Sequence, residues 1–141
     1  MNRGARERAQ PTNAHGRKAL RVLCAEDDDP IAFLVKSVLE REGHHVERVA
    51  DGEEALERIT ADVKFFHLLI TDHQMPRRSG LALVSKLRDT AFSGTIVVHS
   101  SRLRDAEVEA YRALAVDHIL SKPVQLDALL AIVRQVIEST P

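Results

Sequence analysis

Residues 67–76 read His67-Leu68-Leu69-Ile70-Thr71-Asp72-His73-Gln74-Met75-Pro76, an apolar run that stops abruptly at one acidic residue. Turn-forming residues follow at once, and Ser79-Gly80 close the segment. In an open parallel sheet, ligands bind at the carboxyl ends of the strands. We therefore predict a buried strand that presents the carboxylate of Asp72 at the edge of a sheet.

Three other apolar runs also end in chemically active side chains. They end in the acidic cluster Glu26-Asp27-Asp28, in the hydroxyl of Ser100, and in the amine of Lys122, which precedes Pro123. Because parallel strands end at the same edge of a sheet, we expect these acids, the hydroxyl and the amine to lie close to Asp72.

Strand-like and helix-like segments alternate five times along the chain. Short apolar or β-branched runs predict strands at 21–25, 45–50, 66–71, 95–99 and 117–121. Helical spacing of apolar residues predicts helices around 31–39, 55–59, 81–89, 105–114 and 126–137. In the first helix we expect Asp29 as the N-cap, Pro30 at the first helical position and Gly43 beyond the end. The alternation predicts an α/β fold, a five-stranded parallel sheet with helices on both faces.

The composition is that of one ordinary folded domain. Of its residues, 44% are hydrophobic and 29% charged, as in an ordinary globular protein. A length of 141 residues is enough for one domain with its own core and too short for two. Aromatic residues make up only 4%, so we expect an aliphatic core, with the single cysteine, Cys24, as a small buried residue. No apolar run reaches the roughly 20 residues of a membrane span, and no secretory signal opens the chain. We therefore expect a cytoplasmic protein that does not enter a membrane.

The charge is unevenly distributed between the start of the chain and the rest. Residues 1–19 carry five basic residues against Glu7, a net charge of +4, whereas the whole chain has a net charge of -1. This basic segment lacks apolar periodicity, so we predict a disordered N-terminal arm at 1–19 and one folded domain at 20–140.

The acidic cluster at the sheet edge predicts a divalent metal ion. Crowded carboxylates repel one another and are stable only with a bound cation or with raised pKa values. Glu26, Asp27 and Asp72 offer only oxygen ligands, which Mg²⁺ prefers. Lys122 can reach a carboxylate or a phosphoryl oxygen, and Ser100 can donate a hydrogen bond to the same group. Each residue alone also fits a solvated loop or a helix cap, but their shared position at strand ends favours a functional site.

These residues resemble the receiver domains of response regulators in two-component signalling. In that family an acidic pair follows the first strand, Asp-x-x-Met-Pro with a later Gly follows the third, Thr or Ser ends the fourth, and Lys-Pro ends the fifth. Over roughly residues 20 to 140, this chain has Glu26-Asp27, Asp72-His73-Gln74-Met75-Pro76 with Gly80, then Ser100, then Lys122-Pro123. The resemblance implies the flavodoxin-like (βα)5 receiver fold.

The resemblance also implies that Asp72 accepts a phosphoryl group from a sensor histidine kinase or a histidine phosphotransfer protein. Glu26 and Asp27, together with Asp72 and the carbonyl of Gln74, would hold Mg²⁺. The metal ion and Lys122 would neutralise charge during in-line transfer. Such a domain is not an enzyme but a phosphoacceptor that assists its own phosphorylation and dephosphorylation.

The output side of the site departs from the family pattern. The resemblance implies that Ser100 turns toward the phosphoryl group and shifts an equilibrium in the face formed by the fourth helix, fifth strand and fifth helix. Three residues before the lysine, the family usually has Tyr, Phe or His as a rotameric switch, whereas this chain has Ile119. We therefore expect a different or weaker output change. Gln74 and Arg102 flank the expected phosphoryl site, and we expect them to set the lifetime of phospho-Asp72.

We expect the output to pass to another protein. No element follows the helix around 126–137, so the sequence predicts a single-domain regulator without a covalent effector. The part beyond the basic arm is acidic and no helix-turn-helix follows it, which argues against direct DNA binding. The sequence leaves open whether phosphorylation drives dimerisation.

Two other binding functions fit less well. Seven histidines suggest zinc, but no Cys or His-x-x-His spacing supports a tetrahedral site. We expect His73, beside Asp72, to touch a partner or to tune access to the site. A dinucleotide-binding protein needs a glycine-rich turn after its first strand, where this chain has Glu26-Asp27-Asp28.

Two rival functions use the same acidic site. A Mg²⁺-dependent phosphohydrolase with Asp72 as nucleophile typically places a second acid two residues later, where this chain has Gln74. A pseudo-receiver is an interaction module that works without phosphorylation, and the complete set of acids, hydroxyl and amine argues against it. Multiple-turnover hydrolysis of phosphate monoesters would support the first rival, and failure to take up a phosphoryl group would support the second.

Overall fold

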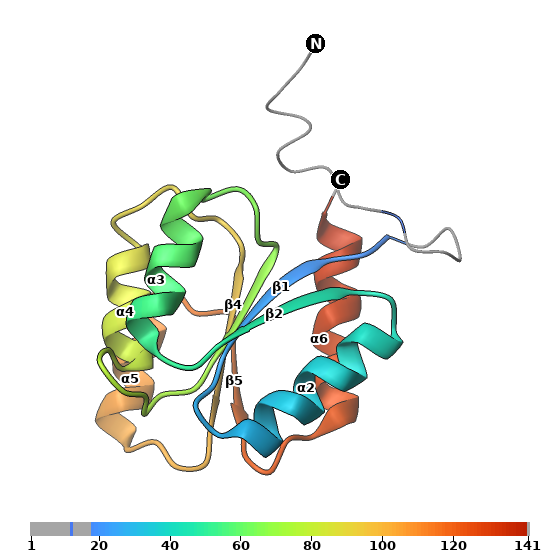
Figure 1. The fold of residues 1–141 in the computed structure, drawn as a ribbon. Coiled ribbons are helices and arrows are strands. Elements are labelled where there is room, and N and C mark those ends of the chain that lie inside the picture. The colour runs from blue at the N-terminus through green and yellow to red at the C-terminus, as the bar shows by residue number, and fades with distance from the viewer. Residues whose placement is uncertain (1–11, 13–17, 141) are drawn as a thin grey trace.

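The chain forms the predicted five-stranded parallel sheet with helices on both faces (Figure 1). The computed structural model describes residues 12 and 18–140. The strands are β1 (Arg21–Ala25), β2 (His45–Val49), β3 (Leu68–Thr71), β4 (Thr95–Ser100) and β5 (His118–Ser121). The helices are α2 (Asp29–Arg41), α3 (Gly52–Ala61), α4 (Gly80–Leu87), α5 (Asp105–Ala113) and α6 (Leu126–Ser139).

Different helices cover the two faces of the sheet. Helices α3, α4 and α5 lie on one face, and α2 and α6 lie on the other (Figure 1). Each face has its own apolar core, and neighbouring strand residues alternate between the two: Leu69 and Val98 belong to the first core, Ile70 and Val97 to the second. Because both faces are buried, the strands read as continuous apolar runs in the sequence.

Cys24 is a core residue, as predicted. Its side chain is 2% exposed and packs in the core beneath α2 and α6. Burial raises the pKa of its thiol to about 12. Because the thiolate is the reactive form of cysteine, the raised pKa and the burial both fit the predicted role in core packing.

The start of α2 differs from the prediction by one residue. Asp28, not Asp29, is the N-cap, because its carboxylate accepts a hydrogen bond from the backbone N–H of Ile31 at 3.1 Å. Pro30 is therefore the second helical residue, still within the first turn, where a missing N–H costs nothing. Gly43 follows the end of the helix as predicted, with a φ of 94°, in the left-handed region that favours glycine.

The order of the strands brings the predicted site residues to one edge. The order is β2-β1-β3-β4-β5, so the chain switches from one side of β1 to the other. Ligands bind at such a switch point in open α/β sheets. Strands β1 and β3 run in register, so Glu26 and Asp72, the residues that follow them, are neighbours. Strand β5 ends beside β4 in the same way, which brings Lys122 next to Ser100.

The predicted N-terminal arm lies almost entirely outside the described residues. Of positions 1–19, the structure describes Thr12, Lys18 and Ala19. Ala19 is fully buried, and the Nζ of Lys18 donates a hydrogen bond to the carbonyl of Thr140 at 3.1 Å. The division into an arm at 1–19 and a domain at 20–140 stays a prediction. Within the described part of the chain, no helix is both long and apolar enough to span a membrane.

Candidate functional site

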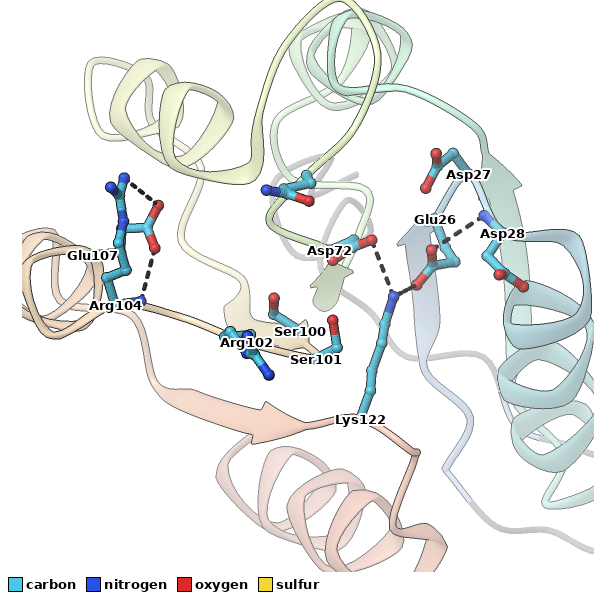
Figure 2. Close-up of a pocket in the computed structure, with 11 residues that line it drawn as sticks. Glu26, Asp27, Asp28, Asp72, Ser100, Ser101, Arg102, Arg104, Glu107 and Lys122 are labelled. Atoms are coloured by element: carbon cyan, nitrogen blue, oxygen red, sulfur yellow. Dashed lines mark hydrogen bonds and ion pairs between the residues drawn. The ribbon is translucent and has the colours of Figure 1, made fainter.

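The predicted strand-end residues line one open cleft of about 860 Å³ (Figure 2). Seven predicted site residues contribute to its lining: Glu26, Asp27, Asp72, Gln74, Ser100, Arg102 and Lys122. Ile119, predicted as the switch position, is absent from the lining. The structure therefore brings the acids, the hydroxyl and the amine together, and it places the switch position elsewhere.

Three carboxylates converge at one end of the cleft. Ligand oxygens of Glu26, Asp27 and Asp72 all lie within 4.8 Å of one another. Glu26 and Asp72 are only 2% and 8% exposed, whereas Asp27 is exposed. Burial raises the pKa of Glu26, and repulsion from Asp72 raises it further, although a hydrogen bond from Lys122 opposes both effects. These closely spaced oxygen donors fit a hard divalent cation such as Mg²⁺.

Lys122 connects the two buried carboxylates, as Figure 2 shows. Its Nζ lies 2.9 Å from Glu26 Oε1 and 3.0 Å from Asp72 Oδ2. Burial alone lowers the pKa of Lys122, but hydrogen bonds and charges from the two carboxylates outweigh burial, so the pKa lies above its ordinary value. The peptide bond between Lys122 and Pro123 is cis. With all groups ionised, one ammonium facing three carboxylates leaves a net charge of about −2, which favours a divalent cation.

The carboxylate of Asp72 is held through both of its oxygens. Oδ2 accepts a hydrogen bond from Lys122, and Oδ1 accepts one from the backbone N–H of His73 at 2.6 Å. The backbone N–H of Asp72 donates to the carbonyl of Ala25 at 2.9 Å, which extends the pairing of β1 and β3 past the end of β3. These contacts give the carboxylate a defined orientation at the cleft.

Ser100 and Ile119 occupy different environments. Ser100, at the end of β4, is 7% exposed and lines the cleft. Ile119 is the register partner of Val98 and packs with it against the core beneath α3, α4 and α5. Because an isoleucine side chain carries no polar atom, it cannot exchange hydrogen bonds when the cleft changes. His118, the preceding residue, pairs with Val97 of the other core, as expected from the alternation of side chains along a strand.

A buried polar cluster beside the cleft was missed by the sequence analysis. The imidazole Nδ1 of His73 lies 2.6 Å from the hydroxyl of Tyr111, and its Nε2 lies 2.8 Å from Glu107 Oε2. His73 is 7% exposed and Tyr111 fully buried, so the His73 ring offers almost no surface to a partner, and its role in tuning access to the site stays a prediction. Its side chain contacts helix α5 instead. Because 34 and 38 residues separate these pairs, no local sequence pattern could have revealed them.

The protonation of this cluster follows from its surroundings. Hydrogen bonds from the backbone and side chain of Arg104, and then one from His73, lower the pKa of Glu107 to about 2. Burial raises the pKa of Tyr111. At neutral pH a protonated hydroxyl therefore faces one imidazole nitrogen and a carboxylate faces the other. The tautomer in which Tyr111 donates to Nδ1 and Nε2–H donates to Glu107 satisfies all three groups.

The zinc hypothesis finds no support in the described residues. There, the one group of three possible metal ligands is the acidic set at the cleft, and it contains no histidine. His44 is buried while His45 is exposed, consistent with side chains that point to opposite faces. The Nδ1 of His44 accepts a hydrogen bond from the backbone N–H of Leu20 at 3.0 Å, so this histidine supports the fold.

The fold and the cleft together define a doubly wound α/β protein with an oxygen-rich acidic site, a hydroxyl and a lysine at its switch point. The family model described as "Response regulator receiver domain" matches residues 22–134. The chain therefore belongs to the response regulator receiver domain family. Receiver domains are phosphoacceptor signalling domains of two-component systems, which bind Mg²⁺ at an acidic pocket and interact with histidine kinases.

Curated relatives include three bacterial regulators. "Response regulator protein PmrA" of Pseudomonas aeruginosa is 35% identical over 121 residues, which cover 86% of this chain and 54% of the relative. "Response regulator MprA" of Mycobacterium ulcerans is 34% identical over 122 residues, 86% of this chain and 52% of the relative. "Transcriptional regulatory protein DltR" of Streptococcus agalactiae is 28% identical over 115 residues, 82% and 50%. This chain spans about half the length of the curated relatives it matches.

Solved structures support the same fold. The receiver domain of the Francisella response regulator 1452 superposes with a TM-score of 0.77 at 27% identity, over 86% of this chain and 99% of that one. Vibrio cholerae chemotaxis protein CheY4 gives a TM-score of 0.75 at 26% identity, over 84% and 98%. The predicted receiver fold is thus confirmed.

Proposed function

We propose that this chain accepts a phosphoryl group on Asp72 from a histidine kinase or a histidine phosphotransfer protein and passes the signal to a protein partner. The contact of Lys122 with both Glu26 and Asp72 is the observation that carries the proposal. It places a fixed positive charge at the two buried acids, where a transferring phosphoryl group needs its negative charge neutralised.

The remaining cleft residues have complementary roles in this proposal. A carboxylate oxygen of Asp72 attacks the phosphorus, the bond to the donor nitrogen breaks, and the leaving imidazole keeps the electron pair. Glu26, Asp27, Asp72 and the carbonyl of Gln74 would hold Mg²⁺, which would neutralise part of the negative charge. Lys122 then faces the new phosphoryl oxygens, and the Ser100 hydroxyl donates a hydrogen bond to one of them.

Mass spectrometry of the intact chain tests the proposal directly. Incubation with acetyl phosphate and Mg²⁺ is expected to add one phosphoryl group per chain. Chelation of the metal is expected to slow the uptake by about a hundredfold or more, because the acidic cluster then repels the donor. Absence of an adduct with acetyl phosphate and with any histidine kinase donor contradicts the proposal. Multiple-turnover hydrolysis of phosphate monoesters supports the phosphohydrolase instead.

We propose further that Gln74 and Arg102 set the lifetime of phospho-Asp72. Both side chains are exposed and line the cleft, so they restrict the approach of water. Alanine at both positions is expected to raise the autodephosphorylation rate severalfold, measured as loss of the phosphoryl adduct over time. Alanine at Arg134 and Gln135, on the exposed side of α6, is a matched control. An unchanged rate rejects the tuning role, and a lower rate shows that the side chains orient water instead of excluding it.

A further inference from the structure

The polar cluster of His73, Glu107 and Tyr111 joins the loop after β3 to helix α5. Both nitrogens of the His73 ring are engaged, one by the Tyr111 hydroxyl at 2.6 Å and the other by the Glu107 carboxylate at 2.8 Å. The rings of His73 and Tyr111 also pack edge to face, with centroids 5.5 Å apart. Apolar side chains would fill this space without the cost of burying polar atoms, so packing alone does not account for the cluster.

One end of the cluster is attached to the proposed phosphoacceptor. The backbone N–H of His73 donates to Asp72 Oδ1, and the carbonyl of His73 accepts a hydrogen bond from the N–H of Gly80 at 2.7 Å. A Cβ atom at Gly80 would lie 2.2 Å from the Asp72 carbonyl and 2.8 Å from the Tyr111 hydroxyl. Gly80 therefore packs directly against the backbone of Asp72 and His73 and against the Tyr111 hydroxyl, so we expect a shift of this backbone to displace the His73 ring as well.

The other end of the cluster is attached to the segment that follows Ser100. Only residues 101–104 separate β4 from α5. Glu107 Oε1 accepts a hydrogen bond from the backbone N–H of Arg104 at 2.8 Å, which anchors the end of this segment and the first turn of α5. Figure 2 shows Glu107 and Arg104 at the far side of the cleft from Glu26. The side chains of His73 and Glu107 thus link Asp72 to the segment after Ser100.

We propose that His73 is a positioning residue that transmits phosphorylation of Asp72 to helix α5 through Glu107 and Tyr111. This inference rests on the proposed function. An aspartyl phosphate carries about −2 charge where the carboxylate carried −1, so phosphorylation adds about one negative charge next to the His73 backbone and replaces the carboxylate by an acyl phosphate. The altered hydrogen bond to His73 N–H moves the ring, and the ring carries the change to the N-terminal turn of α5. Such a contact biases a two-state equilibrium without help from Ile119.

Hydrogen–deuterium exchange of helix α5 tests this inference. Wild type and the variants His73→Leu, Glu107→Gln, His73→Gln and Tyr111→Phe are compared before and after incubation with acetyl phosphate and Mg²⁺. Intact mass gives the labelled fraction of each sample, so that the exchange response is expressed per phosphorylated chain. Amides of β2, at the edge of the sheet opposite β5, serve as the internal reference.

We expect phosphorylation to change exchange in the first turn of α5 in wild type. The response per phosphorylated chain is expected to fall about fivefold or more in His73→Leu and Glu107→Gln. His73→Gln retains an amide that donates to Glu107 and accepts from Tyr111, so it is expected to restore part of the response. Tyr111→Phe removes one hydroxyl and keeps the packing, so it tests the link even where the other variants fold poorly.

Three outcomes overturn the inference. A full α5 response in His73→Leu or in both Glu107→Gln and Tyr111→Phe shows that the link is not needed. A wild-type chain that is labelled but shows no α5 response overturns the inference alone and leaves the proposed function in place. A wild-type chain that is not labelled overturns the proposed function, and the inference with it.

Discussion

An Asp72→Ala variant is expected to take up no phosphoryl group from acetyl phosphate and Mg²⁺, where the wild-type chain takes up one. Glu26 and Asp27 also face the acidic end of the cleft, but Figure 2 shows Asp72 between Glu26 and Ser100. We therefore expect a phosphoryl group on Asp72 to face both the ammonium of Lys122 and the hydroxyl of Ser100. The fixed orientation of its carboxylate lowers the entropic cost of in-line attack.

The control for this experiment is Asp89→Ala. Asp89 is exposed beyond the end of α4 and does not line the cleft, so this variant is expected to be labelled like wild type. Both variants are first checked for cooperative thermal unfolding, because a loss of labelling has meaning only in a folded chain. An adduct that persists in Asp72→Ala shows that Glu26 or another acid accepts the phosphoryl group, and the assignment of Asp72 is then wrong.

The fold could be predicted because polarity changes sharply at the strand ends. Strand β3 is apolar and buried up to Thr71, and the chemistry begins at the next residue. In a parallel sheet this abrupt change marks the carboxyl end of the strand, and the carboxyl ends of the neighbouring strands lie at the same edge of the sheet. The pattern therefore predicts the elements to within a few residues, and it predicts that the site residues at the ends of β1, β3, β4 and β5 lie together.

Other features could not be predicted because they depend on side-chain geometry. Asp28 and Asp29 are equally good capping residues, and only the position of the Ile31 N–H decides between them. Nothing in the sequence marks Tyr111 as a functional residue, since a single aromatic residue in a helical pattern is usually a core residue. Its contact with His73 depends on how α5 is placed against the loop after β3, which no short stretch of sequence encodes.

A Lys122→Met variant is expected to lose both stability and phosphoryl transfer. Removing the ammonium leaves Glu26 and Asp72, two buried carboxylates, without their shared cation. Loss of one partner of a buried ion pair typically costs about 3 kcal/mol or more in the free energy of unfolding. Urea unfolding in the presence of a chelator measures this loss. Labelling by acetyl phosphate is expected to slow about a hundredfold to a thousandfold, because one preorganised positive charge is lost.

Lowering the pH or adding Mg²⁺ is expected to reduce the stability deficit of Lys122→Met. Burial already raises the pKa of Glu26 in wild type, and loss of the hydrogen bond from Lys122 raises it further. The pKa of this carboxyl is higher in the folded state than in the unfolded state. At a pH between these two values the folded state binds more protons, so the free energy of unfolding falls as the pH rises. The deficit is therefore expected to be larger at about pH 8 than at about pH 5. A bound cation replaces the missing charge and recovers stability by mass action.

Lys86→Met separates this effect from a general consequence of losing a lysine. Lys86 is exposed on α4, away from the cleft, so its removal is expected to change stability by no more than about 0.5 kcal/mol and to leave labelling unchanged. Equal stability of Lys122→Met and wild type at about pH 8 in chelator contradicts the charge argument, because two adjacent buried carboxylates cannot both stay ionised without cost. A stable Lys122→Met variant with slow labelling limits the role of Lys122 to transfer. A destabilised variant with normal labelling limits it to the folded state.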